Sequence, residues 1–187
     1  MKKIAVFASG NGSNFQAILD QIKAGTLLAE IGLVVCDKPG AAVIKRAENE
    51  NIPVFHFLPK DYDSKEQFEA EILAHLRKHS IDLVVLAGYM RLIGSTLLEA
   101  YGKKMINIHP SLLPAFPGKD AIGQAIDAGV KVTGVTVHYV DEGMDTGPII
   151  AQKSVEINDE DTKETVEEKV HRMEHVLYPT VIQKILN

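Results

Sequence analysis

Short, nearly continuous apolar runs recur along the first part of the chain, and the segments between them carry apolar residues at helical spacing. The runs lie at residues 3–8, 31–36, 53–57, 82–87 and 105–109. Runs of this length, rich in Val and Ile, are typical of strands that are buried on both faces. Strand and helix signals that alternate in this way predict a doubly wound, mostly parallel α/β sheet, which binds ligands at the carboxyl ends of its strands.

Capping signals locate the helices between these strands. Ser13 and Gln16 have the spacing of a capping box, and so do Ser64 and Gln67. Gly25 stands where a helix that begins near Ser13 would need its C-terminal glycine. Shorter helices are predicted at residues 40–50 and 94–101.

The pattern changes after the last of these runs. A stretch rich in proline and glycine, HPSLLPAFPGKD, leads into a short helix near 121–128. Two strand-like segments follow at 132–140 and 148–156, separated by the acidic sequence DEGMDTG. A long helix is predicted from about residue 162, and Pro179 is expected to kink or break it. We therefore expect an added antiparallel strand region and a C-terminal helix.

Composition and charge narrow the class of protein. Of the 187 residues, 45% are apolar, and the net charge of −5 argues against a nucleic-acid partner. The single Cys36 excludes a disulfide framework or a Cys-based zinc cluster and favours a reducing, cytoplasmic location. No apolar run is long enough for a membrane span. With no repeat or linker, we expect one domain over residues 1–187, with halves at 1–110 and 111–187.

The sequence SGNGSN at residues 9–14 lies between a predicted strand and a predicted helix. Gly10 and Gly12 permit positive φ angles and a close approach of a ligand to the backbone. Free N–H groups at the helix start would face an anion, and Ser13 and Asn14 add side-chain donors. This loop therefore predicts a site for a single phosphate.

Two alternatives to a phosphate site remain open at this loop. It could be a tight turn without a ligand, or part of a nicotinamide-cofactor site in which Asp37 binds the ribose. Phe15 occupies the place of the third glycine of the dinucleotide motif, which weakens that alternative. No Gly-Lys-Ser/Thr sequence follows, so the loop is not of the nucleoside-triphosphate type.

Asn107 and His109 form a polar pair at the end of a predicted strand, in the sequence NIHP. Side chains alternate along a strand, so both point to one face. Each could be ordinary, as a partly buried histidine or a turn asparagine, and a zinc site would need a third ligand. Together they favour acyl transfer to a nitrogen nucleophile, with Asn107 donating to an oxyanion and His109 moving protons.

The loop DEGMDTG at residues 141–147 carries several carboxylates between two strands. It is too short for an EF-hand calcium loop and could be an ordinary hairpin connection. An acid that reaches His109 would stabilise the imidazolium and fix its orientation. The residues alone do not say which acid does so, although Asp145 has a turn-like setting that suits an inward-pointing side chain.

Other polar residues at helix and strand ends are weaker candidates. His75 with His79, and His171 with His175, are spaced four apart, but a metal site on either pair needs another ligand. The first pair suits a solvated helix end. Arg91 follows a strand and is either a site residue or a surface residue.

A set of motifs resembles one family over the whole chain. SGNGSN, LAGYMRL, NIHPSLLPAFPG, GVTVHYVDEGMDTGPIIAQ and EHVLYP occur in the order and at the spacing of the phosphoribosylglycinamide formyltransferases. The resemblance implies a Rossmann-like formyltransferase fold. It also implies transfer of a formyl group from 10-formyltetrahydrofolate to the amine of glycinamide ribonucleotide in purine biosynthesis. No metal is implied, and either a monomer or a homodimer is compatible.

The resemblance also assigns roles to individual residues. It implies a catalytic trio of Asn107, His109 and Asp145. Gly12, Ser13 and Asn14 would hold the substrate phosphate, and Glu174 would contact the glycinamide ribonucleotide. The folate site would comprise Lys65, Met90, Arg91, Leu92, Ile93, Asn107, Asp141, Glu142, Gly143 and Met144.

One stretch departs from the family pattern, and other activities remain as alternatives. Some members carry histidines shortly after the Pro-Gly pair, where this chain has Lys119, Asp120, Ala121 and Ile122. The alternatives are a methionyl-tRNA formyltransferase-like or formyltetrahydrofolate deformylase-like enzyme, and a non-catalytic module that binds a phosphorylated metabolite.

Overall fold

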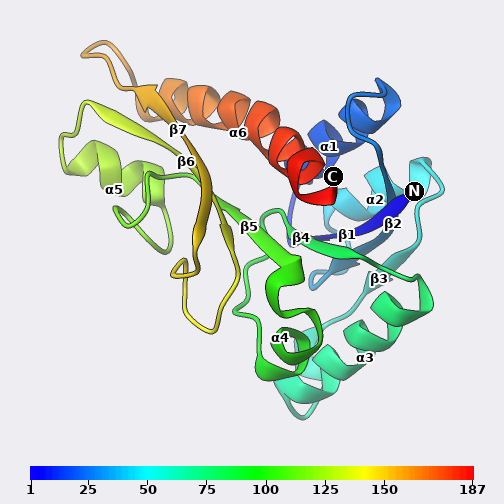
Figure 1. Ribbon diagram of the computed structural model, residues 1–187. Coiled ribbons are helices and arrows are strands. Elements are labelled where there is room, and N and C mark those ends of the chain that lie inside the picture. Colours follow the sequence, from blue (N-terminus) through cyan, green and yellow to red (C-terminus); the bar gives the residue numbers. More distant parts are fainter.

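The computed structural model describes residues 1–187 and contains a seven-stranded sheet with helices on both faces (Figure 1). The strands are β1 (Lys2–Ala8), β2 (Ala29–Cys36), β3 (Val54–His56), β4 (Leu83–Leu86), β5 (Met105–His109), β6 (Val132–Tyr139) and β7 (Ile149–Glu156). The helices are α1 (Ser13–Lys23), α2 (Ala42–Asn49), α3 (Lys65–Lys78), α4 (Ser95–Tyr101), α5 (Ala121–Asp127) and α6 (Lys163–Leu186). Short 3₁₀ turns lie at Pro59–Asp61 and Gly102–Lys104.

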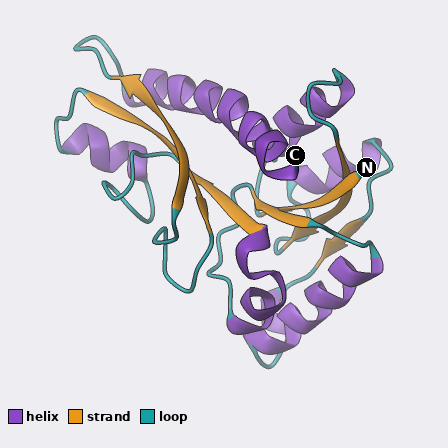
Figure 2. Cartoon of the chain, viewed as in Figure 1, coloured by secondary structure: helices purple, strands orange, loops and turns teal.

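The strand order is β3-β2-β1-β4-β5-β6-β7. Strands β1 to β5 are parallel, and β6 and β7 continue the same sheet in antiparallel pairing (Figure 2). The chain winds outward from β1 to β3 and then returns to place β4 on the other side of β1. The carboxyl ends of β1 and β4 therefore flank the point where the order reverses, which is where open sheets of this type bind ligands.

Two apolar layers cover the two faces of the sheet. The larger cluster packs the inner faces of α1, α2 and α6, with Phe15, Ile18 and Tyr178 among its members. The second cluster packs α3 and α4 around residues such as Phe68 and Leu97. Continuous apolar strands of this kind are buried because helices shield both faces. The doubly wound, mostly parallel sheet predicted from the sequence is confirmed.

Helix α6 is tied to the centre of the sheet through a fully buried tyrosine. The hydroxyl of Tyr178 donates to the carbonyl oxygen of Leu86 at 2.7 Å and lies 3.3 Å from that of Ile106. These carbonyls belong to β4 and β5. Because a buried hydroxyl needs a partner, this contact fixes the position of α6 against the strand ends that lead into the loops.

One local prediction about a helix end is wrong, and one about a helix break is not met. Ser13 is not an N-cap: α1 begins at Ser13, and Gly12 stands at the cap position with φ of 80° and no side-chain bond. Pro179 does not break α6, which continues to Leu186. By contrast, Ser64 caps α3 by accepting from the backbone N–H of Gln67, as its spacing predicts.

Candidate active site

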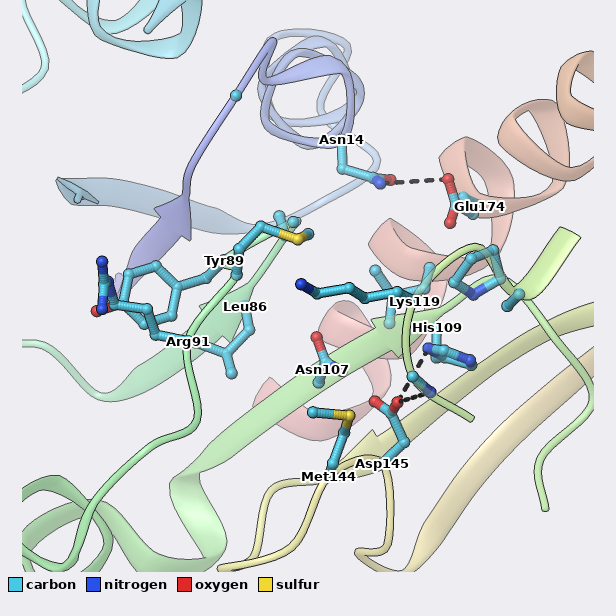
Figure 3. A pocket seen from close by; sticks show the side chains of 18 of the residues that line it. Asn14, Leu86, Tyr89, Arg91, Asn107, His109, Lys119, Met144, Asp145 and Glu174 are labelled. Carbon is cyan, nitrogen blue, oxygen red and sulfur yellow. Dashed lines mark hydrogen bonds and ion pairs between the residues drawn. The ribbon is translucent and has the colours of Figure 1, made fainter. Parts of the chain in front are cut away.

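A cavity of about 710 Å³ lies at the carboxyl edge of the parallel strands (Figure 3). Its wall comes from the loops after β1, β4 and β5, the start of α5, the loop between β6 and β7, and one side of α6. Of the residues predicted for the site, only Lys65 and Glu142 do not line it. The structure thus brings together side chains from across the sequence in the crevice that the topology favours.

The glycine loop turns the chain from β1 into α1 at one end of the cavity. Gly12 has φ of 80°, and a Cβ built on it would lie 2.7 Å from a methyl carbon of Val43, so the position requires glycine. No side chain caps the helix, which leaves its first backbone N–H groups without a partner at the cavity wall. An uncapped helix N-terminus in this place favours an anionic group.

A polar cluster links this loop to α6. The Nδ2 group of Asn14 lies 3.4 Å from Glu174 Oε2, and His171 Nδ1 lies 2.9 Å from the same oxygen. The hydrogen bond that His171 donates to Glu174 is the main cause that raises the pKa of His171. Asn14 Oδ1 is buried without a partner, so the cluster retains an open acceptor.

The pairing of His171 differs from the sequence expectation. The sequence suggests a pair with His175, but the structure pairs His171 with Glu174, because residues three apart are neighbours on a helix face. His175 lies outside the cavity wall, next to a small separate hollow. The spacing of three residues between His171 and Glu174 is the sequence signal that could have identified His171 as a site residue.

The segment after β4 forms another part of the cavity wall and is bonded to groups behind it. Met90 N–H donates to Ser9 Oγ at 2.9 Å, and Arg91 Nε donates to Asp37 Oδ2 at 2.8 Å. The hydroxyl of Ser9 donates to the other oxygen of Asp37 at 2.5 Å. Since both oxygens of Asp37 are used and the residue is 2% exposed, it is not available to bind a ribose. The nicotinamide-cofactor alternative therefore loses its acidic residue.

Helix α3 holds the rest of this segment. Lys65 Nζ donates to the carbonyl oxygen of Leu92 at 2.8 Å, and Gly94 N–H donates to Glu69 Oε2 at 2.9 Å. Burial raises the pKa of the Glu69 carboxyl. Lys65 thus contacts the backbone of the segment from outside the cavity wall.

Asn107 and His138 lie opposite each other on β5 and β6 and form a polar contact. His138 Nδ1 is 2.7 Å from the carbonyl oxygen of Tyr139, so this nitrogen carries the proton and donates. His138 Nε2 then accepts from Asn107 Nδ2, at 3.2 Å. The amide of Asn107 is therefore oriented with its nitrogen towards His138, and its second N–H is left for another acceptor.

His109 and Asp145 are brought together from β5 and the acidic loop. His109 Nδ1 lies 3.4 Å from Asp145 Oδ2, and His109 Nε2 donates to the carbonyl oxygen of Phe116 at 2.9 Å. Asp145 also accepts from the backbone N–H of Gly118 at 2.9 Å. Among the acids of the 141–147 loop, Asp145 is the one that reaches His109, which the residues alone left open.

Lys119 is a cavity residue that received no role from the sequence. Figure 3 shows its side chain reaching across the cavity above Asn107, and the residue is exposed. Its neighbour Asp120 pairs with Lys163 instead, at 3.2 Å. His138 was likewise missed, because its position opposite Asn107 depends on strand register and not on local sequence.

Two further structural observations concern metals and membranes. No group of three or more His, Cys, Asp or Glu side chains is arranged to hold a metal ion. None of the helices has the length and apolar character that crossing a lipid bilayer requires.

Comparison with known proteins places the chain in a family. The family model described as formyl transferase matches residues 2–182. The chain is 63% identical over 186 residues to phosphoribosylglycinamide formyltransferase of Bacillus subtilis (strain 168), covering 100% of this chain and 95% of the relative. It is 39% identical over 188 residues to the trifunctional purine biosynthetic protein adenosine-3 of Drosophila melanogaster, and covers only 14% of that longer protein.

A solved structure agrees with these sequence matches. The crystal structure of glycinamide ribonucleotide transformylase 1 from Geobacillus kaustophilus superimposes with a TM-score of 0.97 at 64% identity, covering 100% of both chains. The chain belongs to the formyl transferase family.

Proposed function

We propose that this protein transfers a formyl group from 10-formyltetrahydrofolate to the amine of N1-(5-phosphoribosyl)glycinamide, in purine biosynthesis. One observation carries the proposal: a single cavity combines an uncapped helix N-terminus with Asn107, His109 and Asp145. Family membership, and the activity named for the Bacillus subtilis relative, support the same reaction.

The cavity wall suits a co-substrate with a flat apolar part. Met90, Leu92 and Met144 are 68%, 44% and 51% exposed, although large apolar side chains are usually buried. All of them line the cavity, which is large enough for a folate-sized ligand. When bound, 10-formyltetrahydrofolate would supply the formyl carbon. The residues proposed to hold it are Met90 to Ile93, Asn107, the 141–144 loop and, from outside the wall, Lys65.

Asn107 is proposed to stabilise the oxygen of the carbon under attack. Its amide nitrogen already has one hydrogen bonded to His138, which fixes the direction of the second. A donor held in place before the reaction needs no reorganisation when charge develops on the oxygen. Such donors contribute roughly 3–4 kcal/mol at comparable sites.

His109 and Asp145 are proposed to move the proton that leaves the substrate amine to the folate nitrogen, whose bond to the formyl carbon breaks as the new bond to the amine forms. The carboxylate next to Nδ1 stabilises the ring when it is protonated. For Nε2 to exchange a proton with the substrate, the ring must release the carbonyl of Phe116. The substrate amine is the nucleophile, so the proposal needs neither a protein nucleophile nor a metal ion.

The glycine loop is proposed to hold the substrate phosphate. The first N–H groups of α1, the hydroxyl of Ser13 and the amide of Asn14 supply donors, and Glu174 offers an acceptor for the sugar part. The net charge of −5 repels anionic ligands at long range, so this local arrangement must supply the attraction.

The proposal is tested by mixing the purified protein with 10-formyltetrahydrofolate and glycinamide ribonucleotide and following release of tetrahydrofolate. Turnover is expected only when both substrates are present. Release without an acceptor would indicate a deformylase, and release with methionyl-tRNA alone would indicate the tRNA enzyme. Calorimetric binding of the phosphorylated substrate with no consumption of formyl-folate would support a non-catalytic module.

A further inference from the structure

A buried polar network lies directly behind the segment after β4, outside the cavity. Asp37 ends up beside this segment because β2 is adjacent to β1, whose terminal loop contains Ser9. Asp37 is 2% exposed and Ser9 is 4% exposed. A carboxylate this deeply buried requires partners for its charge, and its two partners both lead to the cavity wall.

We propose that Asp37 is a positioning residue for the formyl-folate part of the site, acting through Arg91 and Met90. The inference rests on the proposed function, since it assigns Asp37 a role in binding that co-substrate. Asp37 does not line the cavity, and both its oxygens are engaged, so any effect on a ligand must be transmitted by its partners.

The first partner is the guanidinium of Arg91. Its Nε is bonded to Asp37 Oδ2, and its Cζ lies 6.0 Å from the centre of the Phe68 ring. Arg91 lines the cavity and its side chain remains 38% exposed. Because Asp37 binds the inner nitrogen, the terminal nitrogens of the guanidinium are left in the fork geometry that matches a carboxylate or carbonyl oxygen. Asp37 thus fixes the direction in which Arg91 presents its remaining donors.

The second partner acts on the backbone. Ser9 donates to Asp37 Oδ1 and accepts from the N–H of Met90, so the orientation of its hydroxyl is fixed by the carboxylate. The neighbouring residues Leu92 and Gly94 are held separately by α3, through Lys65 and Glu69. Asp37 therefore controls one end of the segment, Met90 and Arg91, and α3 controls the other.

These links can be broken one at a time. Asp37→Asn removes the negative charge beside Arg91 and leaves one acceptor oxygen, which can serve Arg91 or Ser9 but not both, so the pairing of Arg91 is weakened. Ser9→Ala removes the bridge from Asp37 Oδ1 to Met90 and leaves that oxygen without its donor, but it keeps the bond between Asp37 and Arg91. Arg91→Lys keeps the charge at the cavity but cannot reproduce the bond from Nε. Asp159→Asn is the matched control, because it removes the same charge from an exposed pair with Lys131.

The experiment measures kcat, both KM values, and the binding of tetrahydrofolate by calorimetry. Asp37→Asn should raise the KM for 10-formyltetrahydrofolate and the Kd for tetrahydrofolate about tenfold, because binding is lost equally in the ground and transition states. The kcat and the KM for glycinamide ribonucleotide should change less than threefold. Arg91→Lys should give the same pattern. The double variant of Asp37→Asn and Arg91→Lys should differ from Arg91→Lys alone by less than twofold in the KM for 10-formyltetrahydrofolate. Asp159→Asn should leave all values unchanged.

Three results would overturn the inference. They are unchanged folate affinity in Asp37→Asn, an equal rise in both KM values, or fully multiplicative effects of Asp37→Asn and Arg91→Lys. Ser9→Ala, which keeps the carboxylate paired with Arg91, repeats the affinity test if Asp37→Asn does not fold. An inactive wild type would count against the proposed function, whereas an active wild type with unaltered folate binding in the variants would count only against the role of Asp37.

Discussion

The two sides of the cavity are held in place in different ways. The sheet wall, residues 9–14 and 88–94, is bonded to groups behind it, including Asp37 and Glu69. The loop wall, residues 116–120 and 141–145, is bonded to itself, to the end of β5 and to α5. Asp145 accepts from Gly118, His109 donates to Phe116, and Gln124 donates to the carbonyl oxygens of Pro117 and Lys119.

This difference separates residues that position the cavity wall from residues that contact a ligand. In the sheet wall, Ser9, Asp37 and Glu69 fix the backbone without lining the cavity, so affinity can be altered by residues that never touch a ligand. In the loop wall, Asp145 both bridges two loops and stands next to His109, so shape and chemistry depend on the same carboxylate. Substitutions in the sheet wall should therefore change KM, and substitutions at the chemical centre should change kcat.

The largest effect is expected where β5 meets the loop wall. Asn107→Ala removes the donor proposed for the oxyanion and should lower kcat about 10²- to 10³-fold, while both KM values change little. Steady-state kinetics with each substrate varied in turn provides the measurement. A kcat within threefold of wild type would remove Asn107 from the mechanism and erase the distinction between the two walls.

The next effect separates charge from shape at Asp145. In Asp145→Asn, the amide oxygen can still accept from Gly118, so the loops stay joined, but the negative charge beside His109 is lost. We expect kcat to fall about 10²-fold, with thermal unfolding nearly unchanged. Asp145→Ala loses both functions and should unfold at a lower temperature as well. Equal melting temperatures for these two variants would show that the bridge to Gly118 contributes nothing.

A smaller effect is expected in the glycine loop of the sheet wall. Ser13→Ala removes one hydroxyl donor from the proposed phosphate site and should raise the KM for glycinamide ribonucleotide about tenfold, because a hydrogen bond to a charged group contributes roughly 1.5–3 kcal/mol. The kcat and the KM for formyl-folate should stay constant. An unchanged KM for the phosphorylated substrate would argue against a phosphate at this loop.

The smallest effect concerns His171, which lies on α6 between the two walls. Its pKa is raised by Glu174, so the bond stabilises the folded state below the unfolded pKa and loses this effect as pH rises through the folded pKa. His171 is half exposed, which limits the contribution to under about 1 kcal/mol. The free energies of unfolding of wild type and His171→Gln, measured with urea, should differ at pH 6 and become equal at pH 8.5. A difference in the free energy of unfolding that persists at pH 8.5 would show that the stabilisation does not come from protonated His171.

The sequence was sufficient for features that depend on local pattern. The apolar runs gave the parallel strands, and alternation along β5 placed Asn107 and His109 on one face. Features that depend on pairing between distant segments could not be predicted from the sequence. His138 faces Asn107 through strand register, and Asp37 meets Arg91 across 54 positions of sequence. Ser13 failed as a predicted cap because the left-handed backbone of Gly12 starts the helix without one.

The backbone of Asp145 limits which residues evolution or design can place there. Its φ is 57°, a left-handed conformation that aspartate and asparagine tolerate better than other residues with a Cβ. Glutamate would keep the charge but meet the backbone penalty, so a saturation screen would record it as inactive for a reason unrelated to acidity. Glycine would keep the conformation but remove the whole side chain, whereas asparagine keeps both the conformation and the side-chain shape while removing the charge. A change of chemistry at this position is therefore most accessible by the single step from aspartate to asparagine.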